Sequence, residues 1–137
     1  MKAYRVLAAT AAILVVAGSA IYHPAALAQQ AAGIGRTEAL RHDLDEPGRE
    51  IRQVRVDFAP GAFAPEHRHP GGVEVAHVLE GTLEYRLAGG PPITLQAGQS
   101  LFIPAGTVHS ARNVGTGPAA ELATYVVDKS QPLVAAP

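Results

Sequence analysis

The chain has 137 residues, a formal net charge of −1 and no cysteine. A length of this order predicts a single domain. The charge gives no indication of a nucleic-acid partner, which would require a basic patch. The lack of cysteine excludes disulfides and thiolate metal sites, so a tightly bound metal would need histidine and carboxylate ligands.

The first residues have the three parts of a secretory signal peptide. Lys2 and Arg5 form a basic start, residues 6–21 are almost all small or apolar, and an Ala-x-Ala pattern ends at Ala28. We expect residues 1–28 to be removed by cleavage after Ala28, which predicts a periplasmic or secreted protein with no stable membrane association. The alternative is an uncleaved anchor, but the apolar run is shorter than the roughly 20 residues that span a bilayer.

The remaining chain shows strand patterns in place of helical ones. Residues 29–35 predict a flexible leader, residues 36–128 the domain, and residues 129–137 a C-terminal tail without pattern. Apolar residues alternate with polar ones most clearly at Val54, Val56 and Phe58, as in a half-buried strand. The expected strands are 36–44, 50–58, 73–79, 82–87, 93–95, 100–103, 107–114 and 120–127. Short strands separated by Gly/Pro turns indicate an all-β sandwich or barrel.

The central stretch, residues 61–81, contains three residues of metal-binding type. His67 and His69 are two apart, so an extended chain presents both imidazoles on one face. Glu74 follows a Pro-Gly-Gly break that can bring its carboxylate back towards the same point. Two histidines and a carboxylate that converge in this way predict a metal site.

A second group of residues lies downstream, between Gly98 and Asn113. A tight turn at residues 104–106 can deliver His109 onto the following strand, where His109, Ala111 and Asn113 share one face. We expect Asn113 to bond turn backbone groups and to take no part in chemistry.

These two stretches together resemble the two motifs of the cupin superfamily. The first motif, G-x5-H-x-H-x4-E-x6-G, is filled at Gly61, His67, His69, Glu74 and Gly81. The second, G-x5-P-x-G-x2-H-x3-N, is filled at Gly98, Pro104, Gly106, His109 and Asn113. The chain is similar to small single-domain bacterial cupins of the quercetin dioxygenase type. The resemblance implies a jelly-roll-like barrel, a double-stranded β-helix, with one metal held by His67, His69, Glu74 and His109.

The chemistry of this ligand set agrees with the resemblance. Three imidazoles and a carboxylate suit one divalent Fe, Mn, Ni, Cu, Co or Zn ion, and the residues do not select among them. The alternative is that these are ordinary barrel or surface histidines. That interpretation suits a lone His-x-His, whereas four ligand types at the family spacing favour a metal.

The roles of three residues near the predicted metal ligands remain undecided between alternatives. Tyr125 on the last strand is either a second-shell donor or acid/base group, if it faces inward, or a core tyrosine. Phe63 shares the strand parity of His67 and is expected to lie in the core or line the cavity. His77 is expected to face away from the ligands, as a packing or interface histidine.

Several functions remain open at this point. The first is a metal-dependent, dioxygenase-like enzyme on a small organic substrate, with Glu74 and Tyr125 as weak catalytic candidates. The others are a lyase or isomerase, and a non-catalytic module that binds a small ligand or holds metal. The expected inward side chains are apolar and would suit an aromatic or lipophilic ligand. They are Val56, Phe58, Val78, Leu83, Ile103 and Val126.

The sequence also suggests a homodimer. The outward face of residues 73–79 carries Val73, Val75, His77 and Leu79. An apolar face left in water is a liability, so we expect a second copy to cover it.

Overall fold

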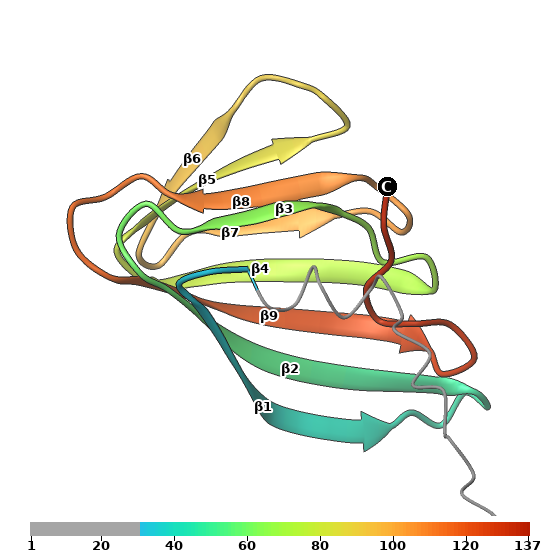
Figure 1. Ribbon diagram of the computed structural model, residues 1–137. Coiled ribbons are helices and arrows are strands. Elements are labelled where there is room, and N and C mark those ends of the chain that lie inside the picture. The colour runs from blue at the N-terminus through green and yellow to red at the C-terminus, as the bar shows by residue number, and fades with distance from the viewer. Residues whose placement is uncertain (1–30) are drawn as a thin grey trace, which may run out of the picture.

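In the computed structural model, which describes residues 31–137, the chain is built from nine β-strands (Figure 1). The predicted signal peptide, its cleavage point and the start of the leader lie outside the described residues. Within residues 31–137, no helix has the length and apolar character needed to cross a membrane.

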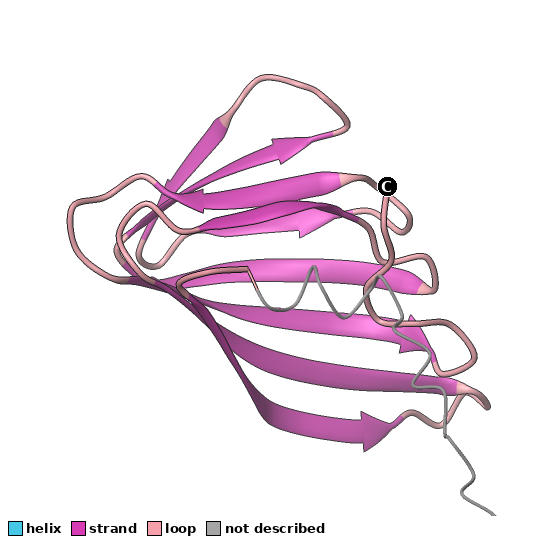
Figure 2. Cartoon of the chain, in the orientation of Figure 1, coloured by secondary structure: helices cyan, strands magenta, loops and turns pink. Residues whose placement is uncertain are grey.

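The strands form two antiparallel sheets that pack face to face (Figures 1 and 2). The five-stranded sheet has the order β1 (Ile34–Asp43), β2 (Arg49–Phe58), β9 (Ala119–Asp128), β4 (Gly72–Glu80) and β7 (Ser100–Ile103). The four-stranded sheet has the order β3 (Phe63–His67), β8 (His109–Asn113), β5 (Thr82–Leu87) and β6 (Ile93–Gln96). This arrangement confirms the all-β, jelly-roll-like fold.

The core lies between the sheets and follows the alternation seen in the sequence. On β2, Val54, Val56 and Phe58 are buried, while Arg55 and Asp57 form an ion pair on the outer side. Strands β4, β5 and β9 alternate in the same way, since successive side chains of a strand point to opposite faces. The fully buried side chains with the largest volumes are Tyr85, Phe58, Leu83, Ile103, Val78 and Asn113.

Two side-chain orientations differ from the sequence-based expectation. Phe63 points outward, is 39% exposed and lies under the guanidinium of Arg112, 4.5 Å from the ring centre. The cause is an irregularity in the pairing of β3 between Ala64 and His67, which changes the strand parity between the two positions. Val126 is half-buried on the opposite face of β9 from the buried Tyr125, so it does not line the interior.

The C-terminal segment has a defined path despite its lack of sequence pattern. In Figure 1 it runs back from β9 past the ends of β4 and β3. Arg68 and Ala135 exchange two backbone hydrogen bonds, of 3.0 and 2.9 Å, and Arg68 Nε donates to the Ala136 carbonyl at 3.0 Å. Val134 is buried. The segment therefore closes one end of the interior beside the loop that follows β3.

The Asn113 side chain bonds turn backbone groups at the other end of the barrel interior, as expected from the sequence. Its buried amide nitrogen donates to the carbonyls of Phe58, Ala59 and Gly117 at 2.9 to 3.2 Å. Its oxygen accepts from the Gly115 N–H at 2.9 Å. One side chain thereby joins the end of β2 to the turn between β8 and β9.

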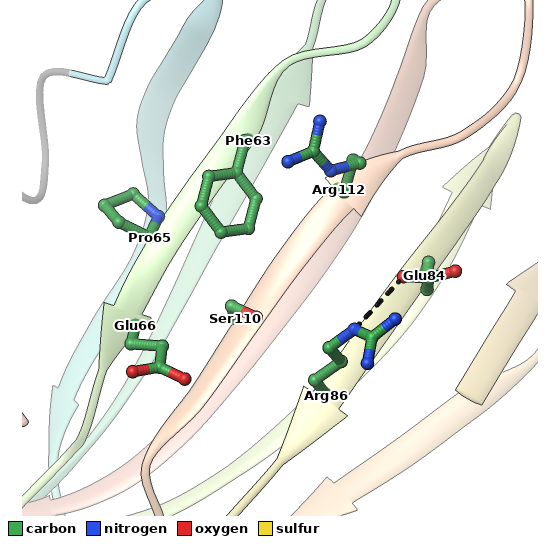
Figure 3. Close-up of a pocket in the computed structure, with 7 residues that line it drawn as sticks. All are labelled: Phe63, Pro65, Glu66, Glu84, Arg86, Ser110 and Arg112. Carbon is green, nitrogen blue, oxygen red and sulfur yellow. Dashed lines mark ion pairs between the residues drawn. The ribbon is translucent and has the colours of Figure 1, made fainter. Parts of the chain in front are cut away.

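A wide groove lies on the outer surface of the four-stranded sheet (Figure 3). It has a volume of about 620 Å³ and includes Phe63, Ser110 and Arg112. Ser110 and Arg112 have the opposite strand parity to His109, so they point away from the interior. This groove is therefore separate from the histidines.

Candidate metal centre

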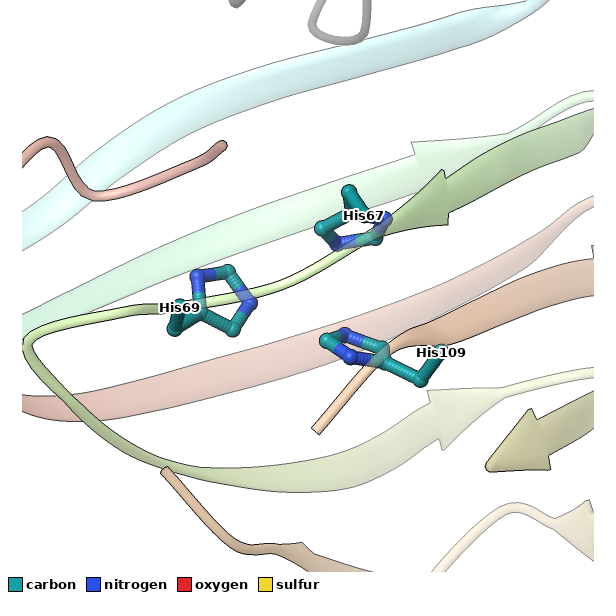
Figure 4. A group of neighbouring side chains, drawn as sticks. All are labelled: His67, His69 and His109. Atoms are coloured by element: carbon teal, nitrogen blue, oxygen red, sulfur yellow. The ribbon is translucent and has the colours of Figure 1, made fainter. Parts of the chain in front are cut away.

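Three histidines meet inside the barrel (Figure 4). His67 ends β3 and lies directly opposite His109, the first residue of β8, while His69 follows in the loop after β3. The ring centres of His67 and His109 are 4.2 Å apart, and His69 lies 5.3 and 5.1 Å from them. One potential ligand atom from each ring lies within 4.8 Å of the others.

The backbone orients all three rings in the same way. His67 Nδ1 lies 2.8 Å from the Pro65 carbonyl oxygen, and His109 Nδ1 lies 2.9 Å from that of Thr107. His69 Nδ1 contacts the carbonyl oxygen of Leu133. A carbonyl only accepts hydrogen bonds, so each neutral ring must carry its proton on Nδ1. The Nε2 lone pair of each ring is then available for a metal.

His69 is held by two segments that are remote in sequence. Its side chain contacts Leu133 in the C-terminal segment, and its carbonyl accepts from Gly106 N–H at 2.9 Å. Gly106 has a φ of +71°, a backbone conformation that glycine adopts readily and other residues rarely. The turn at residues 104–106, expected to deliver His109, thus also anchors His69.

Glu74 approaches the histidines from the opposite sheet. It lies on β4, is buried, and its Oε2 is 2.9 Å from His69 Nε2 and 3.2 Å from His109 Nε2. His69 Nε2 and Glu74 Oε2 are both shielded from solvent, yet neither makes a hydrogen bond of acceptable geometry. Buried polar atoms without such a partner are rare and require an explanation.

The protonation states follow from burial and mutual charge. Burial alone would raise the pKa of Glu74, but the close contacts with His109 and His69 outweigh it and keep the pKa well below its usual range. Burial alone would lower the pKa of His109, yet the contact with the Glu74 carboxylate raises it. The pKa of His67 falls to about 4, because of burial and then of the neighbouring His109.

These observations fit a bound metal ion. A carboxylate and three Nε2 atoms are oriented to one region, and two of the four atoms are buried without a hydrogen-bond partner. A divalent cation would satisfy both and would replace His109 as the positive partner of Glu74. The donor set selects a transition metal over Ca²⁺ or Mg²⁺, which prefer oxygen ligands.

Tyr125 lies beside this group of residues. It is 6% exposed, faces the interior, and its ring centre is 4.8 Å from that of His69. Burial, with the nearby charges of Glu74 and Glu121, raises its pKa well above the usual value, so the phenol stays protonated. The Tyr125 side chain is therefore buried, as expected of a core tyrosine, and it also packs against a candidate metal ligand, as expected of a donor or acid/base group beside the metal.

The sequence analysis missed a second buried carboxyl group. Tyr85 on β5 donates its hydroxyl hydrogen bond to Glu121 on β9, and both side chains are buried. Glu121 shares the strand parity of Tyr125, and Arg52 shares that of Val54 and Val56. Strand parity could therefore have placed both charged residues on the inner face, since each stands on the apolar side of an alternating strand.

The interior is also less apolar than expected. Val56, Phe58, Val78, Leu83 and Ile103 are buried in the core, but none of them lines the cavity beside His69. The cavity next to the histidines, of about 150 Å³, includes charged residues of β1 and β2. Its lining consists of Arg36, Glu38, Arg52, Val54, Tyr125, Leu133 and Val134. Five of the six side chains predicted to face inward are therefore buried, but the wall of this cavity also carries charged side chains of β1 and β2.

The other two histidines within residues 31–137 lie away from this centre. His77 is half-buried on the outer side of β4, with Nδ1 2.8 Å from the Ser100 hydroxyl. His42 is exposed on β1.

Known proteins resemble the chain in sequence and in fold. A family profile described as a cupin domain matches residues 54–125. Germin-like protein 1-1 of Oryza sativa subsp. japonica is 38% identical over 79 residues, which are 55% of this chain and 37% of that protein. The chain therefore spans little more than a third of this relative's length.

Solved structures share the same architecture. A recombinant oxalate oxidase in complex with glycolate has a TM-score of 0.61 and 27% identity, over 76% of this chain and 55% of the other. An uncharacterized conserved protein with a double-stranded β-helix domain from Klebsiella pneumoniae has a TM-score of 0.63 and 25% identity, over 76% and 84%.

Proposed function

The chain belongs to the cupin family, and we propose that it is a metal-dependent enzyme with dioxygenase-like chemistry on a small organic substrate. The observation that carries the proposal is the buried group of Nε2 and carboxylate atoms, two of them without hydrogen-bond partners. The likeness to an oxalate oxidase supports oxidative chemistry at such a centre.

His67, His69, Glu74 and His109 would hold the metal, as the family motifs imply. A transition metal bound by these residues would supply a binding point for dioxygen or an enolate-type substrate, or would polarise a carbonyl. Glu74 keeps a negative charge next to that point. Tyr125 remains protonated, so it can donate a hydrogen bond to a substrate oxygen.

The first test is metal content. His69→Ala and His109→Ala should each lose most of the bound metal by elemental analysis, because each removes one ligand and leaves a buried vacancy. His77→Ala is the matched control, since His77 is also partly buried but lies on the outer side of β4. Full metal occupancy in either ligand variant would show that the ligand set is wrong.

Oxygen uptake tests the reaction class. Flavonols and 1,3-diketones are offered to the purified protein, and the oxygen concentration is followed. Iron, copper or nickel with substrate-dependent oxygen loss supports a dioxygenase. Bound zinc without turnover would instead favour a lyase or isomerase, or a module that binds a ligand without chemistry.

We also propose export and dimer formation. The basic start, apolar run and Ala-x-Ala site support cleavage after Ala28, and intact-mass spectrometry of protein from the periplasmic fraction tests this. Val75 of β4 and Phe102 of β7 are cross-strand neighbours on the outer face, 39% and 56% exposed. Such an apolar pair supports contact with a second copy through this face.

A further inference from the structure

A small cavity lies beside His69, on the side of β1 and β2, separated from it by Tyr125 and Leu133. It has a volume of about 150 Å³, the space of roughly five liquid water molecules. Tyr125 and Leu133 connect it to the centre, because the Tyr125 ring packs on His69 and the Leu133 carbonyl contacts His69 Nδ1. A molecule in the cavity would therefore lie one side chain away from the histidines.

The register of the sheet sets charged groups in line with the centre. Arg52 on β2 is directly opposite Tyr125 on β9, and Tyr125 is directly opposite Glu74 on β4. These residues form one row across the inner face of the five-stranded sheet. Side chains directly opposite each other on one face lie about 5 Å apart at Cβ, so Arg52 and the histidine centre flank Tyr125.

The Tyr125 hydroxyl has no hydrogen-bond partner within residues 31–137, although the side chain is 6% exposed and lines the cavity. A phenol hydroxyl carries its proton at neutral pH and can donate a hydrogen bond. A hydroxyl without a protein partner in the wall of a cavity can donate to an acceptor that enters the cavity.

Side chains of both charges line the cavity. Arg36 and Arg52 contribute two guanidinium groups, and Glu38 contributes the single carboxylate. Arg52 binds one oxygen of Glu38 through Nε and Nη2, at 3.1 and 2.5 Å. A guanidinium has five N–H donors, so this ion pair leaves others for a second acceptor.

We propose that this cavity binds the carboxylate of the substrate, with Arg52 and Tyr125 as its donors, so that the substrate is a small organic acid. The inference rests on the proposed function, because it takes the adjoining centre to be where the substrate reacts. Val54, Leu133 and Val134 give the cavity an apolar side that suits the carbon chain of an organic anion better than an inorganic one.

The test measures the binding of propanoate by calorimetry to the metal-free full chain and to the metal-loaded protein. Propanamide, of nearly the same size and without charge, is the comparison ligand. Arg52→Gln should weaken propanoate binding about 10- to 100-fold, the range expected for a hydrogen bond to a charged group. Propanamide affinity should change little.

Two further variants separate recognition from general charge or stability effects. Arg55→Gln is the matched control, because Arg55 forms a similar ion pair with Asp57 on the outer face of the same strand. It should leave propanoate affinity unchanged. Glu38→Gln removes the competing carboxylate and should increase the affinity several-fold, whereas a purely structural Arg52–Glu38 ion pair predicts no such gain.

The outcomes keep this inference distinct from the proposed function. Propanoate binding by the metal-free protein that responds to Arg52 supports the cavity, even if no turnover is found. Equal loss of affinity in the Arg52 and Arg55 variants, or equal binding of propanamide, would overturn it. Tighter binding of inorganic phosphate than of propanoate would also overturn it, since it would remove the organic acid from the assignment.

Discussion

The C-terminal segment should control metal affinity while contributing little to stability. The perturbation is a chain ending at Gln131, which lacks residues 132–137. It removes the Leu133 carbonyl that holds the proton of His69 on Nδ1. Loss of a partner of this kind typically weakens metal binding 10- to 100-fold, which is about 1.4 to 2.7 kcal/mol.

The expected change in stability is smaller than the number of contacts suggests. Burial of Val134 contributes about 1.5 to 2 kcal/mol. Three hydrogen bonds of Arg68, with Ala135 and Ala136, contribute about 1 kcal/mol each. Ordering the six residues 132–137 costs about 1 kcal/mol per residue. These contributions nearly cancel, so the free energy of unfolding of the metal-free chain should change by no more than about 2 kcal/mol.

The assay is competition for metal between the protein and a chromophoric chelator at fixed pH. A second readout needs no metal: long-range nitrogen–proton NMR spectra report which ring nitrogen of His69 carries its proton. The shortened chain should show a mixture of tautomers in place of the Nδ1–H form. Unchanged metal affinity together with an unchanged tautomer would refute the role of the segment.

Two controls separate the carbonyl from the rest of the segment. Leu133→Ala keeps the backbone carbonyl, so metal affinity should stay within about twofold of the parent. A chain ending at Ala135 loses only the Arg68 side-chain bond to Ala136 and should also bind metal normally. An affinity tag at the C-terminus would lie next to this segment and is therefore avoided in these measurements.

The remaining predictions concern the buried carboxyl group of Glu121 and the outer face of strands β4 and β7. Burial, then the charge of Glu74, raises the pKa of Glu121 to about 8, so the folded metal-free protein holds a proton that the unfolded chain releases near pH 4.5. The contribution of Glu121 to stability should therefore fall as pH rises from about 4.5 to about 8, while that of His67 rises with pH between about 4 and 6.5. Glu121→Gln should remove the Glu121 contribution and make the slope of stability against pH more positive by up to about 1.4 kcal/mol per pH unit in urea unfolding. An unchanged slope would contradict the raised pKa of Glu121. Phe102→Asp should convert a dimer to a monomer in light scattering, and a dimer that survives this change does not use the β4–β7 face.

The sequence predicted the strands best where one face is buried. Val54, Val56 and Phe58 alternate with polar residues, and the structure places them in the core as expected. Strand β3 was not separately predicted, because Pro65 lies inside it and the pairing slips between Ala64 and His67. The slip also explains why Phe63 faces outward and not inward as predicted, since an extra residue in a strand shifts the alternation of its side chains between the two faces.

The histidines and Glu74 could be found because their residue types and spacing carry the signal. The C-terminal segment could not, because its contact with His69 comes from a backbone carbonyl, which every residue type possesses. Its path across the open end of the interior depends on tertiary structure alone. Residues 129–137 have no apolar periodicity from which this path could have been predicted.

The C-terminal segment, residues 132–137, contacts both the metal centre and the cavity proposed to bind a carboxylate. Leu133 contacts His69 through its carbonyl and also lines the cavity, together with Arg52 and Val54. A change in the position of residues 132–137 would therefore alter both metal affinity and carboxylate binding, whereas Arg52→Gln would alter only the second. If the chain ending at Gln131 loses metal but keeps full propanoate affinity in its metal-free form, the cavity does not depend on this wall. Loss of both would place the segment in the substrate site as well as in the metal centre.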